Sequence, residues 1–152
     1  MKIKILLLFL FCSITTFGQK NRLKAPQGVF IRLFWKAGNV MPSPDLLKTE
    51  GTAKGQPVVR EVYVYALTNQ KQTEAEGSFY SKINTALIAK IKTNKQGQAW
   101  LKLPVGFYSL FIKEDKGLYA NTFDDAVNIN VIEIKAKQWA KMEIVIDYAA
   151  FY

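Results

Sequence analysis

The chain contains no histidine, and its single cysteine, Cys12, lies close to the N-terminus. Without histidine there is no imidazole base for a Ser-His-Asp triad and no imidazole ligand for a metal. Cys12 falls within a segment that we expect to be removed, so thiol catalysis and a stabilising disulfide are excluded as well. The folded domain must therefore rely on its hydrophobic core, and we predict no catalytic residue, no cofactor and no enzymatic activity.

Only carboxylates remain for acid–base chemistry, and glycoside hydrolysis needs two of them at a defined separation across a cleft. Asp124 and Asp125 are neighbours in the sequence, and Glu74 and Glu76 lie close together. Nothing in the sequence ties either pair to a cleft. An enzyme that uses carboxylates alone is therefore the third candidate function, after a non-catalytic module and a carbohydrate-binding module.

The first 18 residues have the pattern of a cleavable signal peptide. Lys2 and Lys4 form a basic start, an unbroken apolar run covers 5–11, and Thr16 and Gly18 are the small residues of a cleavage site. The apolar run is shorter than the about 20 residues that cross a bilayer, and no second run follows. We therefore expect an exported protein, periplasmic, cell-surface or secreted, with no transmembrane segment in the mature chain.

The length after cleavage suits one domain with a real core. We expect residues 19–26 to be a flexible N-terminus and 27–152 to form the domain. Loss of Lys2 and Lys4 lowers the formal charge from +9 to +7, and the remaining basic residues are scattered singly along the chain. A scattered arrangement predicts a mildly basic, solvated surface and no nucleic-acid partner.

Alternating apolar and polar residues, together with β-branched and aromatic content, predict about seven strands. The expected strands cover 27–35, 58–67, 86–93, 99–103, 107–113, 131–135 and 142–148. Turn signals separate them, and the last two are expected to pair with each other. This spacing predicts an all-β fold, a single antiparallel two-sheet sandwich.

Two segments between the expected strands lack a clear strand pattern. Residues 37–57 hold three of the five prolines and three glycines, which predicts one long loop. Residues 68–84 are polar apart from Phe79 and Tyr80, which indicates a loop or a short helix over one end of the sandwich.

The strongest strand signal lies in 92–113, KTNKQGQAWLKLPVGFYSLFIK. A Leu-Pro-Val-Gly turn between two alternating strands predicts an antiparallel hairpin. The core-facing residues of that hairpin would be Ala99, Leu101, Leu103, Tyr108, Leu110 and Ile112. Trp100 and Phe111 would then form a cross-strand aromatic pair on the outer face.

The motifs of this region resemble the carboxypeptidase regulatory-like domain. They are a strand ending in Lys-Thr, then NKQGQ, LPVG, YSLFI and GLYAN, and the resemblance spans 58–148, most clearly 91–121. It implies a transthyretin-like (prealbumin-like) β-sandwich that serves as an accessory or surface module. Transthyretin-like hydroxyisourate hydrolases need histidines in their site, so the resemblance does not carry that activity to this chain.

One candidate site is a loop rich in oxygen ligands. Asp124, Asp125, Asn128 and Asn130 carry the carboxylate and amide oxygens that Ca²⁺ prefers, although their spacing does not match an EF-hand. Aspartate and asparagine also favour loops by hydrogen-bonding to nearby backbone, with no metal present. Both interpretations stay open.

The other candidate site is the expected pair of Trp100 and Phe111, which could stack on sugar rings or bind a protein partner. Alternatively, the segment around Phe79 and Tyr80 folds over the pair and buries it. The first function class is a non-catalytic interaction or structural module of the cell envelope. The second is a carbohydrate-binding module that uses exposed aromatic residues, so the expected partner is an envelope protein or a glycan.

Overall fold

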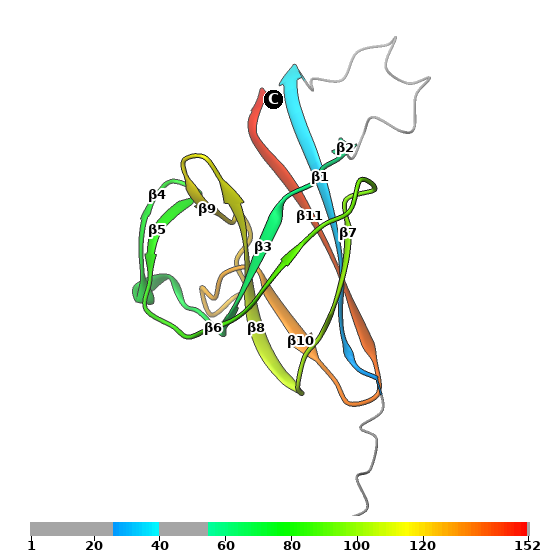
Figure 1. Ribbon diagram of the computed structural model, residues 1–152. Helices are drawn as coiled ribbons and strands as arrows, with labels where there is room; N and C mark the ends of the chain where they lie inside the picture. The colour runs from blue at the N-terminus through cyan, green and yellow to red at the C-terminus, as the bar shows by residue number, and fades with distance from the viewer. Residues whose placement is uncertain (1–25, 40–54, 152) are drawn as a thin grey trace, which may run out of the picture.

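The computed structural model describes residues 26–39 and 55–151, and within them the chain forms two β-sheets and no α-helix (Figure 1). The strands are β1 (Gly28–Asn39), β2 (Gln56–Pro57), β3 (Glu61–Ala66), β4 (Thr73–Glu76), β5 (Phe79–Ile83), β6 (Leu87–Lys92), β7 (Gln98–Lys102), β8 (Gly106–Glu114), β9 (Gly117–Tyr119), β10 (Val131–Ile134) and β11 (Trp139–Phe151). A single 3₁₀ turn, Gln70–Gln72, precedes β4. The predicted all-β sandwich of two sheets is confirmed.

The four-stranded sheet is built around β1. On one side β11 runs parallel to β1 along its whole length, from Gly28 beside Trp139 to Asn39 beside Phe151. On the other side β1 pairs antiparallel with β7 and then with β2. The parallel β1–β11 pair is a departure from the purely antiparallel sandwich that the sequence predicts.

The seven-stranded sheet has the order β4-β5-β9-β8-β3-β6, with β10 as a further partner of β8. One side of β8 pairs with β3. The other side is divided, because β10 pairs with the first half of β8 and β9 with its last residues. As a result, β8 is the central strand of this sheet.

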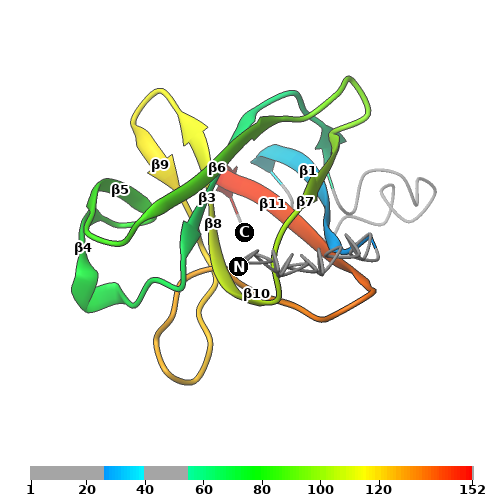
Figure 2. The ribbon, with the colours of Figure 1, turned by 60° about the horizontal axis from the view of Figure 1, so that its bottom comes forward.

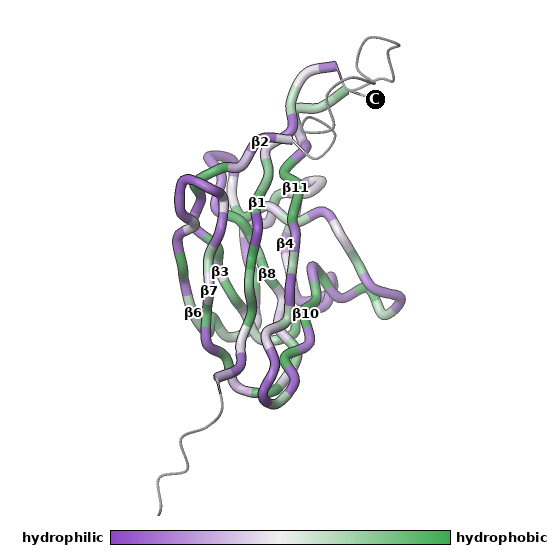
Figure 3. The backbone as a smooth tube through the Cα atoms, turned by 90° about the vertical axis from the view of Figure 1, so that its right-hand side faces the viewer, coloured by the Kyte–Doolittle hydropathy of each residue, from purple (hydrophilic) through white to green (hydrophobic). Residues whose placement is uncertain are grey.

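The main core lies between the two sheets and consists of every second residue of the long strands. On β1 these residues include Val29, Ile31 and Leu33, whose side chains have no solvent exposure. Leu110 and Ile112 of β8 meet them from the opposite sheet. Hydrophobic and hydrophilic residues alternate along several strands in Figure 3, which is the expected pattern of strands with one buried face.

The predicted hairpin between β7 and β8 is wrong. β7 pairs with β1 in the four-stranded sheet, whereas β8 pairs with β3 in the other, so residues 103–105 cross between the sheets. The same alternate residues face the core whether β7 and β8 form a hairpin or are joined by a connection between the sheets. Ala99, Leu103 and Tyr108 are therefore buried as predicted, although the pairing is wrong. The expected pairing of the last two strands is wrong for a similar reason, because β10 joins β8 and β11 joins β1.

The polar segment 68–84 contains the short 3₁₀ turn Gln70–Gln72, but its larger part is a hairpin of β4 and β5, which the prediction of a loop or a short helix missed. Gly77, with a φ of 58°, allows the tight turn between the two strands. The hairpin carries Tyr80 over the outer side of the seven-stranded sheet, where a second core forms around Phe111 with Ala120 and Ile129. The interpretation that this segment buries both Trp100 and Phe111 therefore holds for Phe111 only, because Trp100 stays 53% exposed.

The predicted long loop is shorter at both ends than the sequence suggests, because β1 continues to Asn39 and β2 begins at Gln56. Residues 40–54 lie outside the described residues, and so do the predicted signal peptide and nearly all of the predicted flexible N-terminus. Across the described ranges, the structure contains no helix with the length and apolar character needed to cross a membrane.

Candidate binding face

The outer side of the four-stranded sheet presents a group of aromatic and charged side chains. Core residues and outward residues alternate on β7, β1 and β11, so the register of the three strands decides which outward side chains are neighbours. Trp100 lies beside Phe30, and Phe30 beside Lys141. We call this group the aromatic face; it consists of Phe30, Arg32, Gln98, Trp100, Lys141 and Glu143.

Trp100 is the most prominent side chain of the aromatic face, with 53% of its surface exposed. Its ring stacks on that of Phe30 with the centroids 4.9 Å apart and an angle of 28° between the planes. Such a contact holds the exposed indole ring in one orientation on a rigid sheet. The face therefore offers an ordered aromatic surface to the solvent.

Charged groups lie directly beside the stacked rings. The Nη1 atom of Arg32 is 3.1 Å from Oε1 of Glu143, and both side chains keep 40% of their surface exposed. The guanidinium of Arg32 also lies over the ring of Phe34, 5.1 Å from its centroid. An exposed ion pair contributes little to stability, but it places donors and acceptors next to the aromatic rings.

The predicted partnership of Trp100 and Phe111 is wrong. The two residues belong to different sheets and point away from the core on opposite sides of the sandwich. Phe111 has no solvent exposure, and its ring lies 5.1 Å from that of Tyr80 and 5.5 Å from that of Tyr65. Phe111 is therefore a core residue, and Trp100 is the one of the pair that faces solvent.

The loop with the calcium candidates is held together by its own hydrogen bonds. Asp124 Oδ1 accepts from the backbone N–H groups of Ala126 and Asn128, and its Oδ2 accepts from the Asn128 amide. These bonds, those from Asn128 above all, hold the pKa of Asp124 below its ordinary value. The Asp124 oxygens are therefore used in hydrogen bonds that stabilise the loop, a role that aspartate often has in loops without a metal.

Asn130 is turned away from the other calcium candidates. It is buried, its Oδ1 accepts from Thr122, and its Nδ2 donates to the carbonyl of Leu110 over 3.1 Å. Asp125 is exposed on the loop surface. The four candidates therefore do not converge on one point, and the described ranges contain no group of three or more acidic, cysteine or histidine side chains that could hold a metal.

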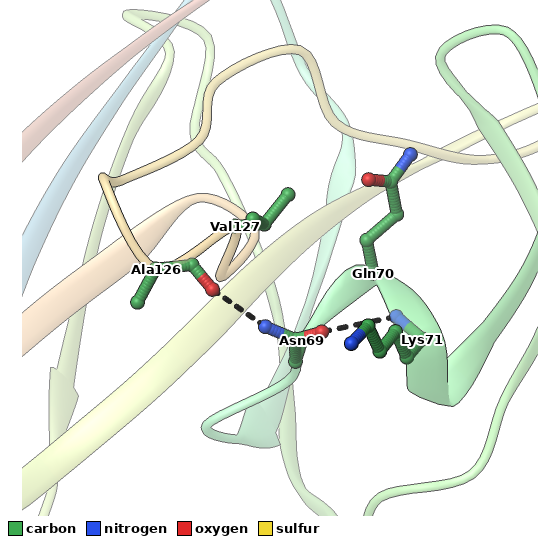
Figure 4. Close-up of a pocket in the computed structure, with 5 residues that line it drawn as sticks. All are labelled: Asn69, Gln70, Lys71, Ala126 and Val127. Carbon is green, nitrogen blue, oxygen red and sulfur yellow. Dashed lines mark hydrogen bonds between the residues drawn. The ribbon is translucent and has the colours of Figure 1, made fainter.

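A shallow pocket of about 380 Å³ lies where this loop meets the 3₁₀ turn, lined by Asn69, Gln70, Lys71, Ala126 and Val127. In Figure 4 the Asn69 side chain spans the two segments: its Nδ2 donates to the Ala126 carbonyl over 2.6 Å, and its Oδ1 accepts from the N–H of Lys71. The amide of Asn69 is thus used in joining the two segments. The pocket offers no charged side chain except the exposed Lys71.

A cluster that the sequence analysis missed lies at the end of the sandwich opposite to the start of β1. Glu114, at the end of β8, has only 4% of its side chain exposed. Its Oε1 accepts from Nε of Arg60 over 2.7 Å, and its Oε2 accepts from the Tyr148 hydroxyl over 2.9 Å. Desolvation, and next the hydrogen bond to Glu114, raise the pKa of Tyr148 to about 12.

A second tyrosine–carboxylate contact lies close to the first. The Tyr119 hydroxyl donates to Oδ1 of Asp147 over 2.7 Å, and the rings of Tyr119 and Tyr148 are 5.5 Å apart. Here β11 has one extra residue relative to β1, which forms a β-bulge. Asp147 and Tyr148 lie at this bulge, and their side chains contact β9 and β8 respectively. Each hydroxyl donates to a carboxylate, so the cluster ties the two sheets together.

One feature of the sequence could have revealed this cluster. Glu114 continues the core-facing series of Leu110 and Ile112, and a carboxylate at such a position needs a buried partner. Arg60 and Tyr148 as the partners could not be inferred, since they are far from Glu114 in the sequence. No protein-family model, no curated protein and no solved structure matches this chain significantly.

Proposed function

We propose that this chain is an exported, non-catalytic β-sandwich module of the cell envelope, similar in role to carboxypeptidase regulatory-like domains, and that it binds its partner through the aromatic face. One observation carries the proposal, the exposed Trp100 ring stacked on Phe30 in a rigid sheet. Tryptophan and arginine are the residues that most often dominate binding energy at protein interfaces, and Arg32 adjoins the stack.

The non-catalytic part of this proposal rests on the chemistry of the side chains. The chain has no imidazole, and the hydroxyls of Tyr119 and Tyr148 both donate to carboxylates. With a pKa of about 12, Tyr148 stays protonated at neutral pH and is no base. The described residues therefore offer a surface for contact with a partner.

Site-specific crosslinking in the intact envelope tests the location of the contact. A photoreactive residue at Gln98, on the aromatic face, should yield a discrete crosslinked product that Trp100→Ala removes. The same residue at Phe123, an exposed aromatic position on the loop after β9, is the matched control and should yield none. Equal products from both positions, or products insensitive to Trp100→Ala, would contradict the proposal.

A glycan is the second candidate partner, favoured by the near-parallel stacking of Trp100 and Phe30. A flat aromatic surface with hydrogen-bonding groups around it suits a sugar ring, and Gln98, Arg32 and Lys141 provide such groups. A panel of envelope polysaccharides should then shift the tryptophan fluorescence in a saturable way. Trp100→Ala should weaken that binding by about tenfold or more, whereas Phe123→Ala should leave it unchanged.

A further inference from the structure

One end of the sandwich exposes three large apolar side chains, those of Val105, Phe107 and Trp139. Here the connection from β7 to β8 and the turn from β10 to β11 come together beside the start of β1, at the bottom of Figure 1 and towards the viewer in Figure 2. We call this end the tip; it consists of Lys102, Val105, Phe107, Lys135, Lys137 and Trp139. It shares no residue with the aromatic face, although Lys102 and Trp139 flank Gly28 on the same side of the four-stranded sheet.

The apolar residues of the tip come from three separate segments, the β7–β8 connection, β8 and β11. Val105 is 59% exposed in the β7–β8 connection. Phe107, 53% exposed, points outward from the seven-stranded sheet, because its neighbour Tyr108 faces the core. Trp139, 37% exposed, points outward from the four-stranded sheet, because its neighbour Ala140 packs against the core. The tip is therefore apolar on both faces and at its apex.

Hydrogen bonds hold the tip in shape. The side chain of Gln27 joins the two turns, since its Nε2 donates to the Leu103 carbonyl over 3.4 Å and its Oε1 accepts from the N–H of Lys137 over 3.2 Å. The Tyr108 hydroxyl donates to the carbonyl of Pro104 over 3.1 Å, and Gly28 N–H donates to the Gln138 carbonyl. The exposure of Val105 and Phe107 is thus imposed by an ordered backbone.

Basic side chains form a collar around these apolar groups. Lys102, Lys135 and Lys137 are all exposed. The acidic residue beside Phe107 is Glu133, and Lys135 lies 3.2 Å from its carboxylate.

We propose that the tip docks on a bilayer surface rich in anionic phospholipid. Val105, Phe107 and Trp139 enter the boundary between headgroups and acyl chains, where tryptophan is favoured, and the lysines lie over the phosphates. Exposed apolar side chains beside exposed lysines match the acyl chains and phosphates of such a bilayer, which is why we assign lipid as the partner of the tip. The tip adjoins the aromatic face, but the two share no residue, so separate substitutions can test the two proposals.

Vesicle sedimentation tests this proposal. The exported, purified chain should sediment with vesicles of equal parts phosphatidylglycerol and phosphatidylcholine. It should stay in solution with phosphatidylcholine alone, and salt should weaken the binding. Val105→Asp combined with Phe107→Asp should lower the partition coefficient by about tenfold or more, because it removes the apolar insertion and adds negative charge. The matched control is Val59→Asp combined with Phe123→Asp, which makes the same two changes at exposed positions away from the tip.

Each outcome decides between the alternatives. If the control pair reduces binding as much as the tip pair, binding follows net charge alone and the proposal is wrong. It is also wrong if the unaltered chain ignores anionic vesicles. Lys102→Gln with Lys137→Gln gives a second test that leaves the apolar groups in place, and it should weaken the binding severalfold at low salt. Trp100→Ala should keep full vesicle binding, so that failure of one proposal does not imply failure of the other.

Discussion

At the scale of single residues, Glu114 is a charged side chain that the fold buries almost completely. Its carboxylate is almost fully buried, and it is tolerated there because Arg60 and Tyr148 each donate a hydrogen bond to one of its oxygens. Arg60 keeps 34% of its side chain exposed, which moderates the strength of the ion pair.

Replacement of Glu114 by alanine should therefore destabilise the fold. We expect the free energy of unfolding to fall by about 2–3 kcal/mol, below the full effect of a completely buried pair, because water can still reach Arg60. Urea unfolding measures the change. Glu61→Ala, which removes an exposed carboxylate from β3, is the control and should stay within about 0.5 kcal/mol of the unaltered chain. Equal losses from both would contradict the assigned role of Glu114.

Tyr148 makes the stability sensitive to alkaline pH. Its folded-state pKa of about 12 exceeds the ordinary value of 10.0. The neutral hydroxyl is thus favoured by folding, and its contribution is fully present below pH 10. Between pH 10 and about 12, the unfolded chain loses this proton while the folded chain keeps it, so stability should fall with rising pH. Chemical unfolding across this range should show a shallower fall for Tyr148→Phe, and an identical slope would contradict the assignment.

At the scale of elements, the faces of the strands could be predicted from the sequence but their partners could not. The alternation of Val29, Ile31 and Leu33 identifies the buried side of β1, because a side chain on a strand has only two directions available. The same alternation is compatible with any neighbour and with every register that keeps this side buried. It therefore could not distinguish a hairpin of β7 and β8 from a connection between sheets, and the Pro-Val-Gly turn favoured the wrong choice.

For the candidate site, too, the direction of a side chain could be predicted from the sequence but its neighbours could not. The exposure of Trp100 follows from its position between Ala99 and Leu101, which face the core, and this much could be predicted. Its stacking partner could not, since Phe30 lies 70 residues earlier and reaches Trp100 only through the β1–β7 register. The Tyr119–Asp147 contact likewise depends on a bulge in β11, which no local pattern indicates.

The turn before β7 depends on one close backbone contact. Gly97 has a φ of 70°, and a Cβ atom there would lie 2.4 Å from the carbonyl oxygen of Leu33. Gly97→Ala should thus push β1 and the turn apart and lower the free energy of unfolding by about 3 kcal/mol or more, since backbone strain and steric overlap add. Thermal unfolding measures the loss.

Gly77 provides a matched control, because it also has a positive φ, 58°, but no atom lies within 4 Å of the Cβ position. Gly77→Ala should cost about 1–2 kcal/mol, the conformational term alone. The difference between the two substitutions measures the contact between the turn and β1. Similar values for both would mean that the backbone moves apart freely at Gly97.

At the scale of the whole molecule, β8 connects two hydrophobic cores. Leu110 and Ile112 face the main core between the sheets, whereas Phe111 faces the second core under the β4–β5 hairpin. Because one strand supplies residues to both, loss of either core should remove the support of the other. We therefore expect the sandwich to unfold as one cooperative unit.

Phe111→Ala tests this cooperativity from the outer side of the sheet. The substitution opens a cavity in the second core and should lower the free energy of unfolding by about 3–5 kcal/mol. Phe107→Ala changes the same residue type on the same strand and face, but at an exposed position, and should cost less than about 1 kcal/mol. Urea transitions followed by circular dichroism measure both losses.

The tryptophans report on the opposite sheet in the same experiment, because Trp35, Trp100 and Trp139 all belong to the four-stranded sheet. If the two cores unfold together, Phe111→Ala should move the fluorescence transition to lower urea by the same amount as the circular dichroism transition. If the second core unfolds by itself, the fluorescence transition should stay where it is in the unaltered chain. Coincident shifts would show that the hairpin covering Phe111 stabilises the sheet that carries the aromatic face, although the two lie on opposite sides of the main core.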